Sequence, residues 1–364
     1  MWKLRREALR IWRQFTFASM HFVEQAWFRL YRARHGDGIW LDGEGPQTDK
    51  VAIFLVYQPD GLGASAGITC AHLAAKGYSV HLVSNAPLSE NDLDMVRPHC
   101  ARILQRPNHG YDFGGYQKAI LDLLESGVSP SRLLLLNDSI WFPLFGDCDL
   151  LNRLEAMEAD LAGPVYYAHR SPHLRHLQSY MMLFSRRAVE SAAFVHFWRC
   201  YKMSNNKLRT VRNGEMRLTE ACVRGGLAMS TLRTAREAAD LSKLSPQARD
   251  AVAAYEGPRG KYSDDTPDGA DGPRVGRYIL TNHPLVNLEL FKLGFVKKDG
   301  APNYLCQRSA LFDPPCRDIL AQMLPEIRDE IKADLVRRGQ GVRLPRDSAE
   351  RSGAAGLRRG VWRV

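Results

Sequence analysis

A short polar segment, Asn137-Asp138-Ser139, follows directly after four leucines at positions 133–136. A fully apolar run of this length predicts a strand that is buried on both faces. A carboxylate at the end of such a strand either caps the next turn or binds a divalent cation and a diphosphate, because Mg²⁺ and Mn²⁺ favour hard oxygen ligands. Taken alone, the segment leaves both interpretations open.

A second polar cluster occupies the glycine-rich segment Arg106–Gly115, which contains a cation, an amide, an imidazole and a carboxylate. The segment leads into a predicted helix, and the start of a helix offers free N–H groups and partial positive charge to phosphate oxygens. Asp112 can hold a ribose or sugar hydroxyl, or it can cap the helix. The segment is therefore a candidate binding loop with a structural alternative.

A third glycine-rich segment, Gly61–Gly67, follows a predicted strand and opens a predicted helix, as dinucleotide-binding loops do. Its spacing is G-x-G-x-x-x-G, and the next strand ends in Ser84-Asn85 rather than in an acid that would bind a ribose. Ordinary turn and packing glycines are the better interpretation.

These segments lie between the strands and helices of a regular alternation predicted for the first half of the chain. Strands are predicted at 51–57, 78–84, 101–105 and 133–136, and helices at 64–76, 89–97 and 115–125. The rhythm predicts the α/β class, with a Rossmann-type, mostly parallel sheet flanked by helices. Ligands bind at the carboxyl ends of the strands in such sheets, so the polar segments are expected to meet there.

The second half of the chain is less regular. Strands are predicted at 160–167, 177–184 and 278–281, and helices at 186–203, 215–225, 285–293 and 316–338. Residues 256–276 are rich in Gly, Pro and Asp, which predicts a mobile loop that can act as a lid.

The composition is that of an ordinary soluble globular protein, with 45% hydrophobic and 25% charged residues. The formal charge of +10 is concentrated at the ends, with a net +5 in residues 1–40 (eight Lys/Arg, three Asp/Glu) and a net +4 in residues 341–364 (six Arg, two acids). Basic ends on a neutral body favour contact with an anionic membrane surface and argue against a domain that binds nucleic acid.

The longest nearly apolar stretch of the basic N-terminal segment is Phe15–Val23. This stretch is too short and contains too many polar residues to cross a bilayer. Residues 1–40 contain four of the seven tryptophans and an apolar stripe at helical spacing. Such an amphipathic helix either lies in a membrane interface or packs on the protein's own core, and both remain open.

Seven cysteines are spread along the chain with no C-x-x-C spacing. This pattern predicts neither a disulfide framework nor a zinc site, and it favours reduced thiols in a cytosol.

Several separated motifs occur in a fixed order and together resemble the rhamnan synthesis protein F family. They are Asn108–Gln117 (NHGYDFGGYQ), Leu135–Pro143 (LLNDSIWFP), His176–Tyr180 (HLQSY) with Phe197-Trp198, and Gly294–Lys298 (GFVKK). The resemblance runs from about Val51 to Asn303.

The resemblance implies a GT-A-like glycosyltransferase that uses a nucleotide-sugar to build rhamnose-containing or related cell-surface polysaccharides, such as the O-antigen of lipopolysaccharide. It places Asn137-Asp138-Ser139 where the metal-binding D-x-D element stands, with Mg²⁺ or Mn²⁺ as the implied cofactor. Only one acid is present in this segment. The donor-binding residues expected on this basis are Tyr57, Asn85, Arg106, Asn108, Tyr111, Asp112, Gly114, Asn137 and Ser139.

Transfer with inversion also needs a general base on the acceptor side. Glu215, at a predicted helix start, is the first candidate and Glu220 the second, and the alternative is that both are solvated acids favoured by the helix dipole. His283 is expected to approach the donor late and to join Asp138 as a metal ligand. The expected acceptor-side residues are Trp141, His176, Gln178, Ser179 and Glu220.

The predicted organisation is an amphipathic N-terminal helix over 1–40, a transferase domain over 48–305, a helical segment over 306–344 and a disordered basic tail over 345–364. The expected location is the cytoplasm, peripherally on the inner face of the membrane, with a glycan or lipid-linked glycan as acceptor. The alternatives are a noncatalytic glycan-assembly protein with a degenerate transferase fold, and a dinucleotide-dependent oxidoreductase that uses Gly61–Gly67.

Overall fold

The computed structural model describes most of the chain between residues 23 and 339. The described residues are 23–34, 36–168, 174–234, 241–246, 249, 283–300, 302–313 and 316–339. The predicted lid at 256–276, the strand at 278–281 and the tail at 345–364 lie outside them.

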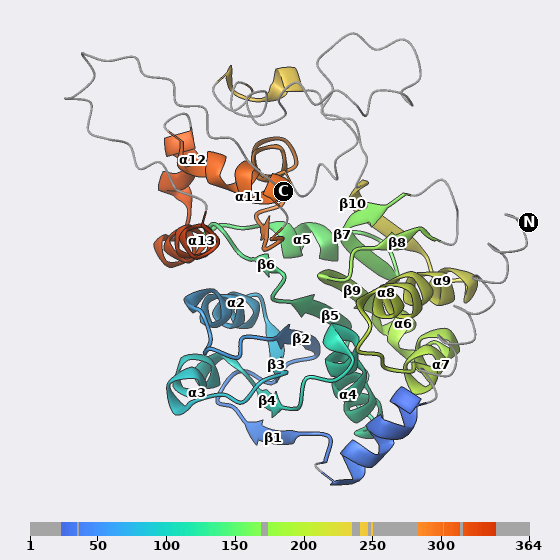
Figure 1. The fold of residues 1–364 in the computed structure, drawn as a ribbon. Coiled ribbons are helices and arrows are strands. Elements are labelled where there is room, and N and C mark those ends of the chain that lie inside the picture. The colour runs from blue at the N-terminus through green and yellow to red at the C-terminus, as the bar shows by residue number, and fades with distance from the viewer. Residues whose placement is uncertain are drawn as a thin grey trace, which may run out of the picture.

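A nine-stranded sheet forms the centre of the described structure, in the order β1-β4-β3-β2-β5-β9-β7-β10, with β8 paired to β7 (Figure 1). Strands β2 to β5 pair in parallel, with Lys50 opposite both Tyr78 and Arg132. Strand β9 is antiparallel to both β5 and β7, so β7 and its parallel partner β10 run with β5. Six strands therefore run one way, and only β1, β8 and β9 oppose them. The strands are β1 Ile39–Asp42, β2 Lys50–Val56, β3 Tyr78–Ser84, β4 Arg102–Gln105, β5 Arg132–Asn137, β7 Leu161–Tyr167, β8 His176–Leu177, β9 Met181–Ser185 and β10 Met229–Thr234.

Two hydrophobic cores lie on the two faces of this sheet, and β2 supplies both. Its alternate residues Ala52, Phe54 and Val56 pack with α2 (Ala64–Ala75) and α3 (Glu90–Val96), whereas Val51, Ile53 and Leu55 pack with α4 (Tyr111–Glu125). This period of two follows from the pleat of a strand that is buried on both faces. The predicted α/β class, with a mostly parallel sheet flanked by helices, is confirmed (Figure 1).

Several predicted elements are divided in the structure. The predicted helix 186–203 breaks at Ser191, because Ser185 and Ser191 each cap a new helix by accepting from Ala188 N–H and Phe194 N–H. The predicted strand 177–184 separates into β8 and β9, and the C-terminal helix breaks before Pro325, since a proline restricts the residue that precedes it. The helices concerned are α6 Arg186–Glu190, α7 Ala192–Cys200, α12 Arg317–Gln322 and α13 Pro325–Arg337.

A second, two-stranded sheet pairs β6 (Ile140–Trp141) with β11 (Val296–Lys297) in antiparallel register. Strand β6 directly follows the polar segment at 137–139, and its pairing with β11 joins that segment to a part of the chain more than 150 residues away. Neither strand was predicted from the sequence. The remaining helices are α5 Leu150–Glu155, α8 Lys207–Thr210, α9 Arg217–Arg224 and α11 Pro302–Ser309, with π-helical turns at Val211–Met216 and Val286–Leu290.

The described part of the N-terminal segment, residues 23–34, is a helix that packs on the protein's own core. Phe28 is buried, and the Glu24 carboxylate accepts from Ser204 Oγ at 2.9 Å and Asn205 N–H at 2.6 Å. Residues 1–22, which carry most of the amphipathic stripe, lie outside the described residues. None of the described helices has the length and apolar character to cross a membrane. All seven cysteines are free thiols.

A buried ion pair fixes α13 to the neighbouring α11. Arg308 donates to Asp334 at 2.8 Å, and the two side chains are only 2% and 7% exposed. Burial works to raise the pKa of Asp334, but hydrogen bonds from Arg337 and Arg338 and the charge of Arg308 outweigh it and hold that pKa below its usual value. The pair therefore stabilises the fold while Asp334 is ionised.

Replacing Asp334 with alanine is expected to lower the free energy of unfolding by about 3–5 kcal/mol, because Arg308 would remain buried without its partner. The loss should be seen at neutral pH by urea denaturation, and it should shrink as the pH falls below the ordinary range of an aspartate. Asp329→Ala, on the same helix and 68% exposed, is the matched control. Equal stability of the two variants would contradict the assignment.

Candidate active site

The polar residues that follow the parallel strands meet at one edge of the sheet. Tyr57 and Gln58 follow β2, Asn85 follows β3, Arg106 follows β4, and Asp138 follows β5. Parallel strands in adjacent positions end at the same edge, so these side chains approach one another as the alternation predicts.

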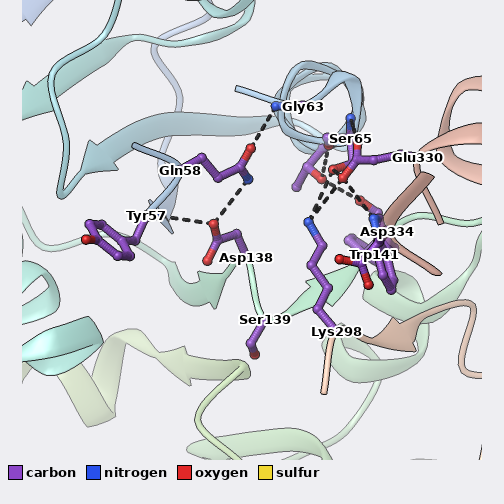
Figure 2. A network of polar contacts seen from close by, with 12 residues as sticks. Tyr57, Gln58, Gly63, Ser65, Asp138, Ser139, Trp141, Lys298, Glu330 and Asp334 are labelled. Atoms are coloured by element: carbon purple, nitrogen blue, oxygen red, sulfur yellow. Dashed lines mark hydrogen bonds and ion pairs between the residues drawn. The ribbon is translucent and has the colours of Figure 1, made fainter. Parts of the chain in front are cut away.

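Asp138 is oriented entirely by neutral donors. One of its carboxylate oxygens, Oδ2, accepts from Tyr57 N–H at 3.0 Å and from Gln58 Nε2 at 3.1 Å (Figure 2). Gln58 is itself held by Gly63 N–H, which donates to its Oε1 at 2.7 Å. Because these donors carry no net charge, they fix the carboxylate without neutralising it, and the charge remains available to a ligand.

Asn137 joins this segment to the loop at 106–115. Its Oδ1 accepts from Ser139 N–H at 3.1 Å and Ser139 Oγ at 2.6 Å, while its Nδ2 donates to Asp112 Oδ2 at 3.0 Å. A second carboxylate therefore lies beside Asn137-Asp138-Ser139, although the segment itself contains only one.

The surroundings of Asp112 disfavour its ionised form. Burial, followed by the negative charges of Asp138 and Glu215, raises its pKa to about 7, against the opposing effect of Lys297 and Lys207. This environment therefore favours the protonated form of Asp112 more than solvent does.

Glu215 reaches the same site from the π-helical turn at 211–216. Burial raises its pKa, and the charges of His176 and Lys297 and hydrogen bonds from Ser179 oppose that rise. His176 Nε2 lies 3.7 Å from Glu215 Oε2, and its Nδ1 is 2.8 Å from Leu174 O. These contacts hold the carboxylate in one orientation and leave it with a raised proton affinity, which suits a general base.

The π-helical turn has a steric basis. A Cβ at Gly214 would lie 2.7 Å from the ring of Phe113, so only glycine allows the turn to approach α4 this closely. Single π turns inside helices recur at functional sites, where the additional residue redirects a side chain. Here the turn brings Glu215 to the acidic cluster of Asp112 and Asp138.

Arg106 builds the loop rather than facing outward. It is buried, and its Nη1 donates to Asn85 Oδ1 at 2.6 Å while Nη2 donates to His109 O at 3.0 Å. Burial lowers its pKa to about 10, which still leaves a cation at neutral pH. Gly114 allows the tight turn, since a Cβ there would lie 1.9 Å from His109 O.

The start of α4 is also set by the loop. Tyr111 has a φ of 51° and begins the helix four residues earlier than predicted, after Gly110 at a φ of 75°. Its carbonyl accepts from Asn85 Nδ2 at 3.2 Å, and the same Nδ2 lies 3.4 Å from Asn108 Oδ1. Tyr111 and Tyr57 are 40% and 48% exposed, so two solvent-accessible aromatic residues lie next to the polar residues of the site in the chain.

Three expected site residues have other surroundings in the structure than those predicted for them. Trp141 is 1% exposed and donates from Nε1 to Glu330, which leaves no ring face for an acceptor. Glu220 pairs with Arg224 and lines a cavity of about 700 Å³ between α7 and α9. His283 is 1% exposed, and neither ring nitrogen has a hydrogen-bond partner among the described residues. His176, Gln178 and Ser179 do gather, with Gln178 Nε2 3.4 Å from His176 Nε2 and Ser179 bonded to Glu215.

Lys297 belongs to the site although it was not among the expected residues. Its charge acts on both Glu215 and Asp112, and its Nζ lies 4.3 Å from the ring centroid of Tyr180. The motif at 294–298 was the one available signal in the sequence.

The glycine-rich loop at 61–67 is filled by the protein's own carboxylate. Glu330 of α13 accepts from Ser65 N–H at 2.9 Å, Ser65 Oγ at 2.8 Å and Trp141 Nε1 at 2.8 Å (Figure 2). A Cβ at Gly63 would lie 2.7 Å from that carboxylate. A dinucleotide phosphate would need the position at the start of α2 that Glu330 takes, so the structure argues against the oxidoreductase alternative.

The site offers hard oxygen donors to a divalent cation. Asp138 and Asp112 provide two carboxylates, which is the number that Mg²⁺ often takes from a protein when substrate phosphates complete its shell. Within the described ranges, no group of three or more His, Cys, Asp or Glu side chains is arranged to hold a metal ion by itself. The donor set thus fits a cation shared with a phosphate.

Comparison with known proteins places this site in a family. Residues 80–251 match the rhamnan synthesis protein F family. The uncharacterized protein y4gN of Sinorhizobium fredii is 33% identical over 293 residues, which cover 75% of this chain and 76% of that protein. The chain belongs to the rhamnan synthesis protein F family. Membership supports a glycosyltransferase of polysaccharide biosynthesis.

Among solved structures, the mannosyltransferase PcManGT from Pyrobaculum calidifontis, in complex with GDP-Man and Mn²⁺, matches with 10% identity and a TM-score of 0.32. The match covers 89% of this chain and 96% of that chain. This similarity is too low to transfer a site. In the present chain, residues 80–251 match the family. This segment contains Asp112, Asp138 and Glu215, whereas Lys297 lies beyond it.

Replacing Asp112 with asparagine is expected to stabilise the fold as the pH rises. The raised pKa means that the folded state binds a proton more tightly than the unfolded chain, so wild-type stability falls between the usual pKa of 3.8 and about 7. Asparagine keeps an oxygen for Asn137 Nδ2 and has no charge to bury. The variant should gain about 2–4 kcal/mol above neutral pH and nothing near pH 4.

Chemical denaturation across this pH range measures the effect. Asp94→Asn, an exposed acid on α3, is the control and should show no pH-dependent gain. A difference between Asp112→Asn and the wild type that stays constant with pH would contradict the assigned environment.

Proposed function

We propose that the protein is a glycosyltransferase that moves a sugar from a nucleotide-sugar donor to a growing cell-surface polysaccharide or lipid-linked glycan. The observation that carries the proposal is the convergence of Asp112, Asp138 and Glu215 at the carboxyl edge of the sheet. Family membership supports the same chemistry.

The donor occupies the space between Asp138 and the loop at 106–115. A divalent cation, Mg²⁺ or Mn²⁺, supplies positive charge to the diphosphate leaving group when bound, and Asp138 with Asp112 would hold it. Tyr57 and Tyr111 present exposed rings to the nucleoside, and the amide of Asn137 with the hydroxyl of Ser139 borders the sugar. Arg106 and Gly114 keep the loop in this shape.

Glu215 acts on the acceptor. Its carboxylate removes the proton from the acceptor hydroxyl, the oxygen bonds to the anomeric carbon, and the bond from that carbon to the phosphate oxygen breaks as the nucleoside diphosphate leaves. Ser179 and His176 hold Glu215 in position, and Gln178 borders the acceptor.

The sugar proposed on the basis of the family is rhamnose, and the product a rhamnose-containing polysaccharide such as an O-antigen. The basic N-terminus, with a net +5 over residues 1–40, is proposed to bring the enzyme to the anionic inner face of the cytoplasmic membrane, where lipid-linked acceptors are exposed.

Screening nucleotide-sugars with and without Mn²⁺ or Mg²⁺ tests the proposal. One donor class should stabilise the protein saturably against thermal unfolding and should be slowly hydrolysed without acceptor. Asp138→Asn should abolish turnover, and Glu215→Gln should lower kcat by about 100- to 10,000-fold with little effect on donor binding.

Glu125→Gln, an exposed acid at the end of α4, is the matched control and should behave as the wild type. An Asp138→Asn, Glu215→Gln double variant that still transfers sugar would refute the site. A protein that binds no nucleotide-sugar would support the noncatalytic alternative instead.

A further inference from the structure

The cavity of about 700 Å³ between α7 and α9 has no part in the site described above. None of the residues that line it belongs to the acidic cluster, and the two helices that form it pack side by side (Figure 1). On α7 the lining residues recur at intervals of three and four, which puts them on one face of the helix: Ala193, His196, Phe197 and Cys200. Its volume is in the range of cavities that hold small molecules.

The opposite wall comes from the π-helical turn at 211–216 and from α9. Its lining residues also recur at helical spacing, from Asn213 through Arg217 to Arg224. A Cβ at Gly225 would lie 2.5 Å from Ala193 Cβ, so only glycine lets the end of α9 approach α7 this closely. Both residues line the cavity, and the two walls therefore meet at this end.

Positive charge exceeds negative charge on these walls. Three cations, Lys202, Arg217 and Arg224, line the cavity together with one acid, Glu220. Arg224 pairs with Glu220 at 2.8 Å, whereas Lys202 and Arg217 are exposed and form no ion pair with any described residue. Two cations thus remain for an anionic ligand, and the planar fork of an arginine matches a carboxylate or a phosphate.

The walls also carry groups that a bare anion would not use. Phe197 is half-buried and stacks on Tyr201, with ring centroids 5.8 Å apart. Asn213 adds an amide that can donate and accept hydrogen bonds. An aromatic surface with a few polar groups suits an organic ligand, and cations beside them suit one that carries negative charge.

We propose that this cavity binds an anionic sugar, a pyranose that carries a phosphate or a carboxylate. The inference goes beyond the proposed function, because binding here requires no transfer. Within that function, two parts of an acceptor have this chemistry. One is an acidic sugar of the growing polysaccharide, and the other is the glycosyl phosphate of a lipid-linked glycan.

The place of the cavity relative to Glu215 fits a part of the acceptor that does not itself react. Asn213 and Arg217 line the cavity, and Glu215 lies between them in the chain. Residues two apart on a helical turn point to roughly opposite sides. Glu215 acts on Asp112, while its two neighbours reach the cavity on the other side of the same turn.

Cys200 provides a readout at the cavity itself. It lines the cavity, and it is the only exposed thiol among the seven cysteines, all of which lie in described parts of the chain. Alkylation of the full chain with iodoacetamide, followed by peptide mass spectrometry, therefore measures access to the cavity. Cys306, which is half-buried and does not line the cavity, is the internal reference.

Glucose 1-phosphate or glucuronate, at constant ionic strength, should slow the alkylation of Cys200 saturably, and neutral glucose should not. Protection by only one of the two anionic sugars would identify which anion the cavity takes. Arg217→Gln should weaken the protecting sugar's binding about tenfold or more, because it removes a charge-assisted hydrogen bond. Arg212→Gln, an exposed cation on the same turn that does not line the cavity, is the matched control and should bind as the wild type.

A Cys200 that reacts equally fast with and without both anionic sugars at millimolar concentration would overturn the inference. Equal protection by inorganic phosphate would also overturn it, since the site would then be one for a bare anion. The same holds for unchanged binding in Arg217→Gln. None of these outcomes depends on sugar transfer, so the screen of nucleotide-sugars tests the proposed function separately.

Discussion

Three carboxylates gathered at one edge of a sheet impose the constraint on which the rest of the site depends. Asp112, Asp138 and Glu215 repel one another, and burial adds to the free energy of keeping them ionised. Two kinds of group offset this free energy of ionisation. Neutral groups, such as Tyr57 N–H and the amide of Asn137, orient the acids, while the positive charge of Lys297 opposes the rise in the pKa of Asp112 and Glu215.

The choice of neutral donors has a chemical consequence. A carboxylate in a direct ion pair gives up both its basicity and its capacity to bind a cation, because the partner already satisfies its charge. Asp138 instead is held at a fixed orientation by neutral donors, and burial raises the pKa of Glu215 against the charges of His176 and Lys297. An acidic cluster of this kind is suited both to a divalent cation and to the removal of a proton.

Rigid elements set the positions of these groups. Strand β2 is buried on both faces, and Glu330 fixes the start of α2. Burial works to raise the pKa of Glu330, but the charge of Lys298 and hydrogen bonds from Ser65 and Trp141 hold it below its usual value. Glu330 accepts from Ser65 N–H, and two residues earlier Gly63 N–H donates to Gln58, which in turn donates to Asp138 (Figure 2). A carboxylate in the C-terminal helix thus contributes to the orientation of a carboxylate at the centre of the sheet.

The sequence predicted the parts of this arrangement that depend on local pattern. The apolar runs and the glycine-rich turns gave the parallel strands and the polar edge, because strand burial and turn geometry are read within a few residues. The π turn was not predictable, since it depends on the contact between Gly214 and Phe113. The position of Lys297 depends on the pairing of β11 with β6, a strand more than 150 residues away.

Two expected residues, Glu220 and Trp141, have partners outside the acidic cluster. Glu220 lies in α9, beyond the π-helical turn that carries Glu215, and it pairs with Arg224 instead. Trp141 was expected on the acceptor side, yet it is buried and donates from Nε1 to Glu330. Sequence position near a site does not fix the direction of a side chain when the next strand belongs to another sheet.

The N-terminal helix is part of the same scaffold. Trp27, Phe28 and Tyr31 pack their rings on His109, within the loop that holds Asp112. Through Glu24 the helix also fixes Asn205, whose Oδ1 accepts from Gly110 N–H at 2.8 Å at the start of α4. These contacts cross the boundary expected between residues 1–40 and the transferase domain. The described part of the basic N-terminal segment is thereby joined to the loop proposed to bind the donor.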